Sequence, residues 1–454
     1  MTVVRSFLTA ADIAKRIRAG TLSPVAVVEA YLARIAEIES ALRAWVHLDT
    51  EGALKTARAL EAEARAGRFR GPLHGVPVGI KDIYHVAGMV TTAGAGAFAH
   101  ERPQTDATAV ARLRAAGAVI LGKTATTEFA YADPGETRNP WNLEHTPGGS
   151  SSGSAAAVAA GMIPLALGSQ TVGSTLRPAA YCGLVGFKPT HGRISAAGVV
   201  PLAWSLDHVG IFVRCVEDAA LALSVLAGHD PADGLSAAVP PGDYLGALAS
   251  FERPPRLGIP RGLFASRASP EVTAHLEAIA AAFAKAGAAV EEVKLPPSAE
   301  AIHDAGQLVM RVEAAAYHRD RFARHRDAYR PKIRGLIEEG LAIAGVEYVS
   351  AQQARRRFRE EMGPILDGHD ALLMPVAPTT APKGLTWTGD PGLCAPWSFS
   401  GLPAIALPSG LAQDSLPLSI QLVAGAFAEG RLLPVARWCE AILSFTATPS
   451  LKLV

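Results

Sequence analysis

The chain has 454 residues, and its 43 Lys and Arg against 42 Asp and Glu give a formal net charge of +1. Apolar residues make up 49% of the sequence and charged residues 19%, a balance that excludes a disordered chain. The near-zero charge, without a long basic run, argues against a protein dedicated to binding nucleic acid or an anionic membrane. The chain has 43 Gly and 32 Pro, so we expect many turns and special backbone positions.

Residues 1–70 are predicted to be helical. Thr9 begins one helix that ends at Gly20, and Ser23 followed by Pro24 is typical of a second helix start. The N-terminal residues mix charged and apolar side chains, so they lack the apolar core of a secretory signal. The four cysteines form no C-x-x-C pair, which excludes a disulfide framework, and no apolar run is long enough to span a bilayer. We therefore expect a soluble, cytoplasmic protein without membrane contact.

Residues 71–213 alternate Ala-rich helical stretches with short apolar runs that resemble strands: Val76–Ile80, Val119–Leu121 and Leu184–Phe187. This alternation predicts an α/β core whose strands are buried on both faces. Residues from about 230 to 370 carry long helical patterns with most of the clustered charge, and we expect a helical insertion on the substrate side. Residues 371–454 return to short apolar runs, which predict C-terminal strands that complete the core. The chain 1–454 is thus predicted to be a single domain.

No metal or cofactor site is predicted. The 13 histidines are scattered without H-E-x-x-H or another metal-ligand spacing, and the sequence contains no P-loop. His318 and His325 lie seven residues apart on an expected helix, so they share a face, which we expect to be exposed to solvent.

A Gly/Ser-rich segment, Pro147–Ser154, is the most informative part of the sequence. Composition alone would predict a flexible linker, but the segment runs directly into an Ala-rich helical stretch of the core. It also contains the G-x-S-x-G pattern of the nucleophile elbow of α/β-hydrolases, with Ser151 as the nucleophile. That alternative, an esterase, requires a strand directly before the pattern, whereas residues 139–147 have the composition of a loop.

Two further elements carry reactive residue types. Gly168–Pro178 is a second segment rich in glycine and hydroxyl side chains, and Gly75–Asp82 places Lys81 at the end of an apolar strand. Lys81 either extends its ammonium group into solvent or is desolvated. Desolvation would lower its pKa and give a neutral amine that acts as a base.

These three elements, in this order and at this spacing, resemble the amidase signature family. The resemblance extends to Cys182–Thr190 and Ser205–Gly210 and, more loosely, to the C-terminal strands. It implies an α/β fold with a central mixed, twisted β-sheet covered by α-helices on both faces. It also implies hydrolysis of amides, and in some members of ureas, carbamates or esters, without a cofactor.

The resemblance further implies a catalytic set of Lys81, Ser150 and Ser174. Ser150 matches the serine that follows a cis peptide bond, and Ser174 matches the nucleophile. A neutral Lys81 would take a proton through the Ser150 hydroxyl, so that Ser174 Oγ attacks a carbonyl and forms an acyl-enzyme. The oxyanion hole would consist of the backbone N–H groups of Thr171, Val172, Gly173 and Ser174.

The nucleophile segment departs from the commonest family pattern, Asp-Thr-Gly-Gly-Ser-Ile-Arg. Gln170 replaces the acid, Val172 replaces a glycine, and the arginine lies three residues after the nucleophile, as Arg177. Malonamidase-like members share this placement, and there the arginine can hold a substrate carboxylate; anchoring of the Arg-Pro turn is the alternative. We expect substrate contacts from Gly149, Gln170 and Arg177.

The expected substrate is a small or aryl amide, or a carbamate (urethane). Specificity is expected from the 230–370 insertion and from three aromatic residues that either contact the substrate or belong to the core: Trp387, Trp397 and Phe399. One alternative is the glutamine-hydrolysing component of an amidotransferase, which works with a partner protein, and another is a non-catalytic binding protein. We expect a monomer or a homodimer with no nucleic-acid partner.

Overall fold

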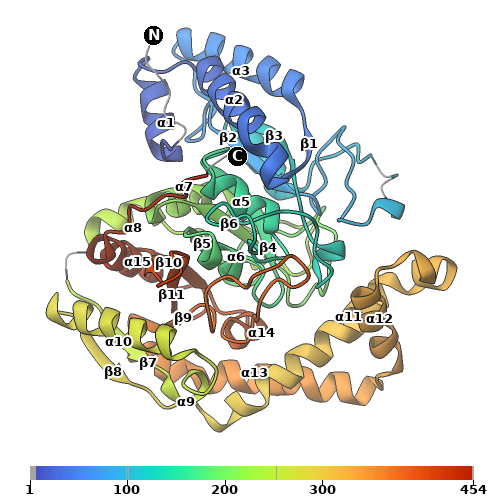
Figure 1. The fold of residues 1–454 in the computed structure, drawn as a ribbon, viewed down its shortest axis with the longest axis vertical. Helices are drawn as coiled ribbons and strands as arrows, with labels where there is room; N and C mark the ends of the chain where they lie inside the picture. The colour runs from blue at the N-terminus through green and yellow to red at the C-terminus, as the bar shows by residue number, and fades with distance from the viewer. Residues whose placement is uncertain (1–6, 99, 101, 252, 452–454) are drawn as a thin grey trace.

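A computed structural model describes residues 7–98, 100, 102–251 and 253–451 (Figure 1). Its strands are β1 (Trp45–Leu48), β2 (Pro77–Lys81), β3 (Val119–Thr124), β4 (Leu165–Gln170), β5 (Val185–Lys188), β6 (His208–Val213), β7 (Arg256–Ile259), β8 (Ala289–Glu292), β9 (Ala371–Pro375), β10 (Ala404–Leu411) and β11 (Pro417–Val423). Within the described residues they form one 11-stranded sheet in the order β1-β3-β2-β4-β6-β5-β10-β11-β9-β7-β8. Parallel pairing joins β2 to β3 and β4, and β7 to β8 and β9, whereas the other neighbours are antiparallel.

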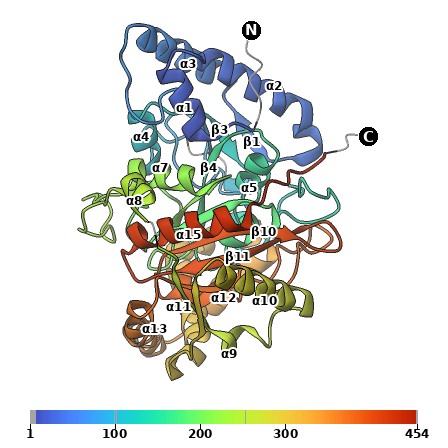
Figure 2. The same cartoon turned by 90° about the vertical axis from the view of Figure 1, so that its left-hand side faces the viewer.

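Helices flank this sheet (Figures 1 and 2), and α15 lies across β10 and β11. The helices are α1 (Ala10–Arg18), α2 (Pro24–Leu42), α3 (Thr50–Arg65), α4 (Thr108–Ala115), α5 (Ser152–Ala159), α6 (Leu176–Tyr181), α7 (Val216–Leu226), α8 (Tyr244–Ser250), α9 (Arg261–Phe264), α10 (Pro270–Lys285), α11 (Ile302–His325), α12 (Pro331–Ala342), α13 (Gly345–Asp367), α14 (Ala395–Phe399) and α15 (Glu429–Leu443). The expected fold class, a mixed α/β architecture around a central mixed sheet, is confirmed.

The predicted helix starts are confirmed by their capping hydrogen bonds. The Thr9 side chain accepts from the backbone N–H of Asp12, and the Ser23 side chain accepts from that of Ala26 at the start of α2. Each bond satisfies one of the backbone donors that a helix leaves without an intrahelical partner at its N-terminus. Local sequence therefore determines where the N-terminal helices begin.

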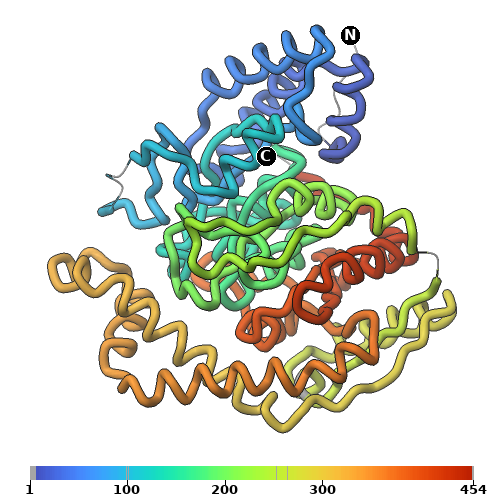
Figure 3. The backbone as a smooth tube through the Cα atoms, turned by 180° about the vertical axis from the view of Figure 1, so that it is seen from behind, coloured from blue at the N-terminus to red at the C-terminus, as the bar shows by residue number. Residues whose placement is uncertain are grey.

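The 230–370 segment corrects one expectation, because it contains two strands as well as helices. β7 and β8 extend the central sheet from β9 to its edge. Their sequences carry little strand signal, since each has four residues and β8 is a largely exposed edge strand that ends in Glu291 and Glu292. The sequence pattern identified only the helices of this segment, of which α11 and α12 form an arm that projects from the body (Figure 3).

The expectation that His318 lies on a solvent-exposed face of α11 is wrong. His318 is buried instead of exposed: its Nδ1 lies 3.1 Å from the Tyr329 hydroxyl, and its ring packs 4.5 Å from that of Phe129. His325, by contrast, is exposed as expected. No helix in the described part of the chain combines the length and apolar character needed to cross a bilayer.

Sheet register places the reactive segments together. β2 and β4 are parallel neighbours in which Ile80 pairs with Leu167, so Lys81 and Ser169 lie at the same ends of adjacent strands. The segment after β4 leads through Ser174 into α6, and the Gly/Ser-rich segment leads into α5, which packs against β2 and β4. Carboxyl ends of parallel strands are a common location for binding and catalytic residues.

Candidate active site

Lys81, the last residue of β2, is fully buried, so the desolvated alternative holds. Its Nζ donates hydrogen bonds to two hydroxyl groups, Ser150 Oγ at 2.7 Å and Ser169 Oγ at 2.8 Å. Burial lowers the pKa of the Lys81 amine to about 7, although the nearby Asp207 carboxylate opposes this decrease. An amine with this pKa exchanges its proton readily at neutral pH, as a catalytic base must.

Ser150 is fixed by backbone contacts on both sides. The Gly149–Ser150 peptide bond is cis, as expected from the resemblance, and the Ser150 carbonyl accepts from the Thr127 N–H at 3.2 Å. A Cβ atom on Gly149 would lie 2.8 Å from Thr388 Cγ2, so glycine is needed for this close approach. These contacts hold the Ser150 hydroxyl against Lys81.

Ser151 is not a nucleophile of the elbow type, and that alternative is wrong. Its hydroxyl is fully buried and bonds the backbone of Ser169, donating to the carbonyl and accepting from the N–H, each at 3.2 Å. The residues before it form a loop, whereas an elbow follows directly on a strand.

The nucleophile segment, residues 171–174, carries backbone donors that the protein does not use. In the described residues, the N–H groups of Thr171, Val172, Gly173 and Ser174 donate to no protein acceptor. Backbone N–H groups in buried surroundings are nearly always paired, so these four consecutive donors are available to a bound oxygen atom. Ser174 itself is 8% exposed, at the end of this segment.

Gln170, one of the expected substrate contacts, uses both polar ends of its side chain for hydrogen bonds within the protein. Its Oε1 accepts from the N–H groups of Thr175 and Leu176, at 2.8 and 2.9 Å, and its Nε2 donates to Ser398 Oγ at 2.8 Å. The Ser398 hydroxyl in turn donates to the Val172 carbonyl at 2.7 Å. Gln170 and Ser398 therefore fix the backbone conformation around residues 171–174 through buried hydrogen bonds.

Arg177 has the contacts expected of a structural anchor. It is 5% exposed, and its guanidinium donates to the Gly149 carbonyl at 2.6 Å and to the Gly389 carbonyl at 2.5 Å. A third hydrogen bond, of 3.1 Å, reaches the Thr388 hydroxyl. Arg177 thereby joins the helix after Ser174 to the residue before Ser150, and it aligns the two serine segments.

Sequence reasoning missed three residues of this site: Ser169, Asp207 and Thr388. Ser169 could have been found from the parallel register of β2 and β4, which brings it beside Lys81. Thr388 lies in a loop far along the chain and carries no local signal. Of the three aromatic residues, Trp397 and Phe399 are buried in the core, and Trp387, next to Thr388, is 53% exposed.

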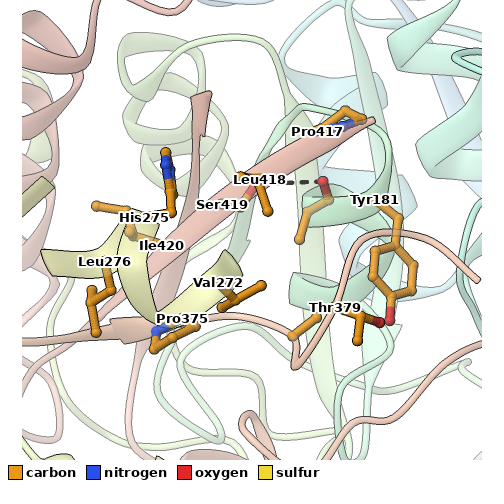
Figure 4. Close-up of a pocket in the computed structure, with 12 residues that line it drawn as sticks. Tyr181, Val272, His275, Leu276, Pro375, Thr379, Pro417, Leu418, Ser419 and Ile420 are labelled. Carbon is orange, nitrogen blue, oxygen red and sulfur yellow. Dashed lines mark hydrogen bonds between the residues drawn. The ribbon is translucent and has the colours of Figure 1, made fainter. Parts of the chain in front are cut away.

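Two of the cavities near the sheet, in the described part of the chain, differ in their relation to the candidate site. One, of about 10 Å³, lies between α6, α10 and β11 and is lined mainly by apolar side chains such as Val272 and Leu276 (Figure 4). None of the candidate catalytic residues lines it, so we assign it no role. The other, of about 200 Å³, is lined by His191, Trp204 and Asp207 among others.

Comparisons of the sequence and of the structure with known proteins agree on one family. A family model named Amidase matches residues 26–433. This chain belongs to the amidase signature family. A protein of Roseiflexus castenholzii, named as one of the subunits of glutamyl-tRNA(Gln) amidotransferase, is 39% identical to this amidase-signature chain over 464 aligned positions, which cover 94% of each chain.

Solved structures of amidase-signature enzymes resemble this chain over almost its whole length. One, described as a vestigial protein complex that reveals the evolutionary origins of an s-triazine catabolic enzyme, has a TM-score of 0.90 at 31% identity and covers 98% of this chain and 100% of that one. The native peptide amidase from Stenotrophomonas maltophilia has a TM-score of 0.84 at 32% identity, with 97% and 98% covered. The chain is therefore an amidase-signature hydrolase that acts on carbon–nitrogen bonds.

Proposed function

We propose that this amidase-signature hydrolase cleaves small or aryl amides, and carbamates or esters of similar size, through Lys81, Ser150 and Ser174. The observation that carries the proposal is the 2.7 Å hydrogen bond between the buried Lys81 Nζ and Ser150 Oγ. With a pKa of about 7, the Lys81 amine is largely neutral at slightly alkaline pH and accepts a proton there.

Acylation begins when the neutral Lys81 amine takes the proton of the Ser150 hydroxyl, while Ser150 Oγ takes the proton of Ser174. Ser174 Oγ then forms a bond to the carbonyl carbon of the substrate, and the carbonyl π electrons move to oxygen. The unused N–H groups of residues 171–174 stabilise this oxyanion. As the oxyanion collapses, the C–N bond breaks and the relay returns the proton from Lys81 to the leaving nitrogen.

Deacylation repeats the sequence with water as the nucleophile. Lys81 accepts a water proton through Ser150, the hydroxide bonds to the acyl carbon, and the ester bond to Ser174 Oγ breaks. The proton then returns to Ser174 Oγ. One substrate and one water give a carboxylic acid and an amine, and the enzyme is restored.

The surroundings of the site support an uncharged substrate with an aromatic group. Trp387 is exposed and directly precedes Thr388, whose side chain lies against Gly149, so the backbone of Trp387 lies close to the serine segments. The Nη atoms of Arg177 already donate to backbone carbonyls, which gives no support to a bound carboxylate. An aryl amide or aryl carbamate would stack on Trp387.

A hydrolysis screen tests this proposal, with aliphatic amides, anilides, carbamates and esters as substrates. We expect turnover of anilides or aryl carbamates by the wild-type protein and none above the uncatalysed rate by Ser174→Ala. Ser151→Ala is the matched control and should stay within a few-fold of the wild type. Full activity of Ser174→Ala would overturn the proposal.

A second candidate is the glutamine-hydrolysing component of an amidotransferase, favoured by the names of relatives such as the R. castenholzii protein. It predicts glutamine hydrolysis that depends on a partner protein. We expect the isolated chain to turn over aryl amides without a partner. Ammonia release from glutamine only after a partner is added would support the second candidate.

A further inference from the structure

Lys81 has no carboxylate beside it to balance a positive charge. Its two hydrogen-bond partners are hydroxyl groups, and within the described residues no acidic oxygen lies within ion-pair distance of Nζ. The adjacent residue, Asp82, is already paired with Lys123 at 2.6 Å, and both side chains are fully buried. The protonated state of the relay must therefore be balanced by a charge from another element.

Asp207, which directly precedes β6, is held in a defined orientation near this relay. Its Oδ1 accepts from the Thr171 hydroxyl at 2.5 Å, and its Oδ2 accepts from the N–H groups of Leu202 and Ala203 at 2.8 and 3.0 Å. Three donors to one carboxylate favour its ionised form, although burial raises its pKa to about 6.

Two adjoining cavities connect Asp207 to the relay and to the surface. A small cavity of about 10 Å³ is lined by both Asp207 and Ser169, the second hydroxyl partner of Lys81. The cavity of about 200 Å³ also includes Asp207 and extends to the exposed side chain of Trp204. Asp207 thus lies between solvent and the buried end of β2.

We infer, on the basis of the proposed function, that Asp207 is a positioning residue that orients the nucleophile segment through Thr171 and supplies the negative charge acting on Lys81. Its carboxylate makes the protonated amine easier to form during the reaction, when Lys81 carries the proton of Ser174. The same carboxylate holds the Thr171 side chain, and the N–H of Thr171 belongs to the expected oxyanion hole.

The turn that carries Asp207 is itself braced by the insertion. The buried Glu313 of α11 accepts from the Ser205 N–H at 2.9 Å, and Arg355 of α13 donates to the Ser205 carbonyl at 2.9 Å. Several titratable or charged groups surround Asp207 and its turn. They are Lys81, Tyr84, His191, His208, Asp233, Glu313 and Arg355. In this set, Asp207 is the carboxylate that acts on Lys81.

The test is the pH dependence of sulfonylation by phenylmethylsulfonyl fluoride, followed by the mass of the intact chain. Ser174 Oγ bonds to sulfur, fluoride leaves, and the Ser174 proton passes through Ser150 to Lys81. In the wild type, we expect the rate to rise with pH as Lys81 loses its proton. In Asp207→Asn the negative charge is absent, so this rise should move to lower pH by about one unit.

Two variants separate charge from structure. Asp207→Glu keeps the negative charge, so its sulfonylation rate should rise at the same pH as in the wild type, while its maximal rate falls. Asp233→Asn, a change at another carboxylate of the large cavity, should match the wild type in both respects. An unshifted rise in a folded Asp207→Asn protein, or a shift in Asp207→Glu, would overturn the inference. Absence of labelling at Ser174 in the wild type would instead contradict the proposed function.

Discussion

In the proposed mechanism, the charge state of Lys81 determines the pH range of activity. Because the neutral amine is the proposed base and its pKa is about 7, kcat/KM should rise about tenfold per pH unit below pH 7 and level off above pH 8. Lys81→Arg, which stays protonated at all these pH values, should lose about 10³-fold in kcat/KM. Initial rates between pH 5.5 and 9.5 measure both effects. A flat profile in the wild type would exclude Lys81 as the base.

Burial of Lys81 also makes stability depend on pH. Its pKa is lower in the folded chain than the ordinary value near 10.4, so the unfolded state binds the proton more tightly between about pH 7 and pH 10. The wild type therefore loses stability as the pH falls through this range, and the full cost is present below about pH 7. Lys81→Met should raise Tm more at pH 6.5 than at pH 9.5, measured by thermal unfolding. An equal change at the two pH values would argue against this pKa.

At the scale of elements, the segment between β4 and α6 keeps its shape through the Gln170 side chain. Gln170→Ala would leave the N–H groups of Thr175 and Leu176 without their acceptor and would remove the donor to the Ser398 hydroxyl, which keeps its own hydrogen bond to the Val172 carbonyl. We expect a loss of about 3 kcal/mol in the free energy of unfolding and a fall in kcat larger than the rise in KM. The loss in kcat follows because the oxyanion donors lie in the loosened segment.

Ser400→Ala is a matched control for Gln170→Ala. Its hydroxyl donates to the Pro396 carbonyl within α14 and does not reach the nucleophile segment. Denaturant unfolding and steady-state kinetics should show less than about 1.5 kcal/mol of destabilisation and an unchanged kcat for this variant. A kcat for Gln170→Ala within twofold of the wild type would mean that Gln170 does not support the oxyanion donors.

Elements with strong local signals were predictable from the sequence, and those set by distant contacts were not. Thr9 and Ser23 cap their helices as predicted because a helix start depends on neighbouring residues. The inward orientation of Gln170 depends on Ser398, 228 residues away, and no local pattern encodes that contact. His318 was expected at the surface, because helical spacing shows which residues share a face but not what packs against it.

At the scale of the whole molecule, a lysine side chain of α12 joins the 230–370 segment to two loops outside it. The Lys332 ammonium group, near the start of α12, donates to the Ala132 carbonyl and to the Thr386 carbonyl, each at 3.1 Å. It thus ties together the loop after β3 and the loop that carries Trp387. The bridge thus fixes the backbone directly before Trp387 relative to the loop after β3.

Removal of this bridge should affect substrate binding more than chemistry. In Lys332→Met both carbonyls remain accessible to water, so we expect less than about 1 kcal/mol of destabilisation. The Trp387 loop becomes less ordered, so KM for an aryl amide should rise about three- to tenfold while kcat stays within twofold. Lys383→Met is the matched control, since the Lys383 side chain forms an exposed ion pair with Glu144 and its removal should leave both constants unchanged. If the two variants raise KM equally, the bridge does not position Trp387, and specificity must arise elsewhere.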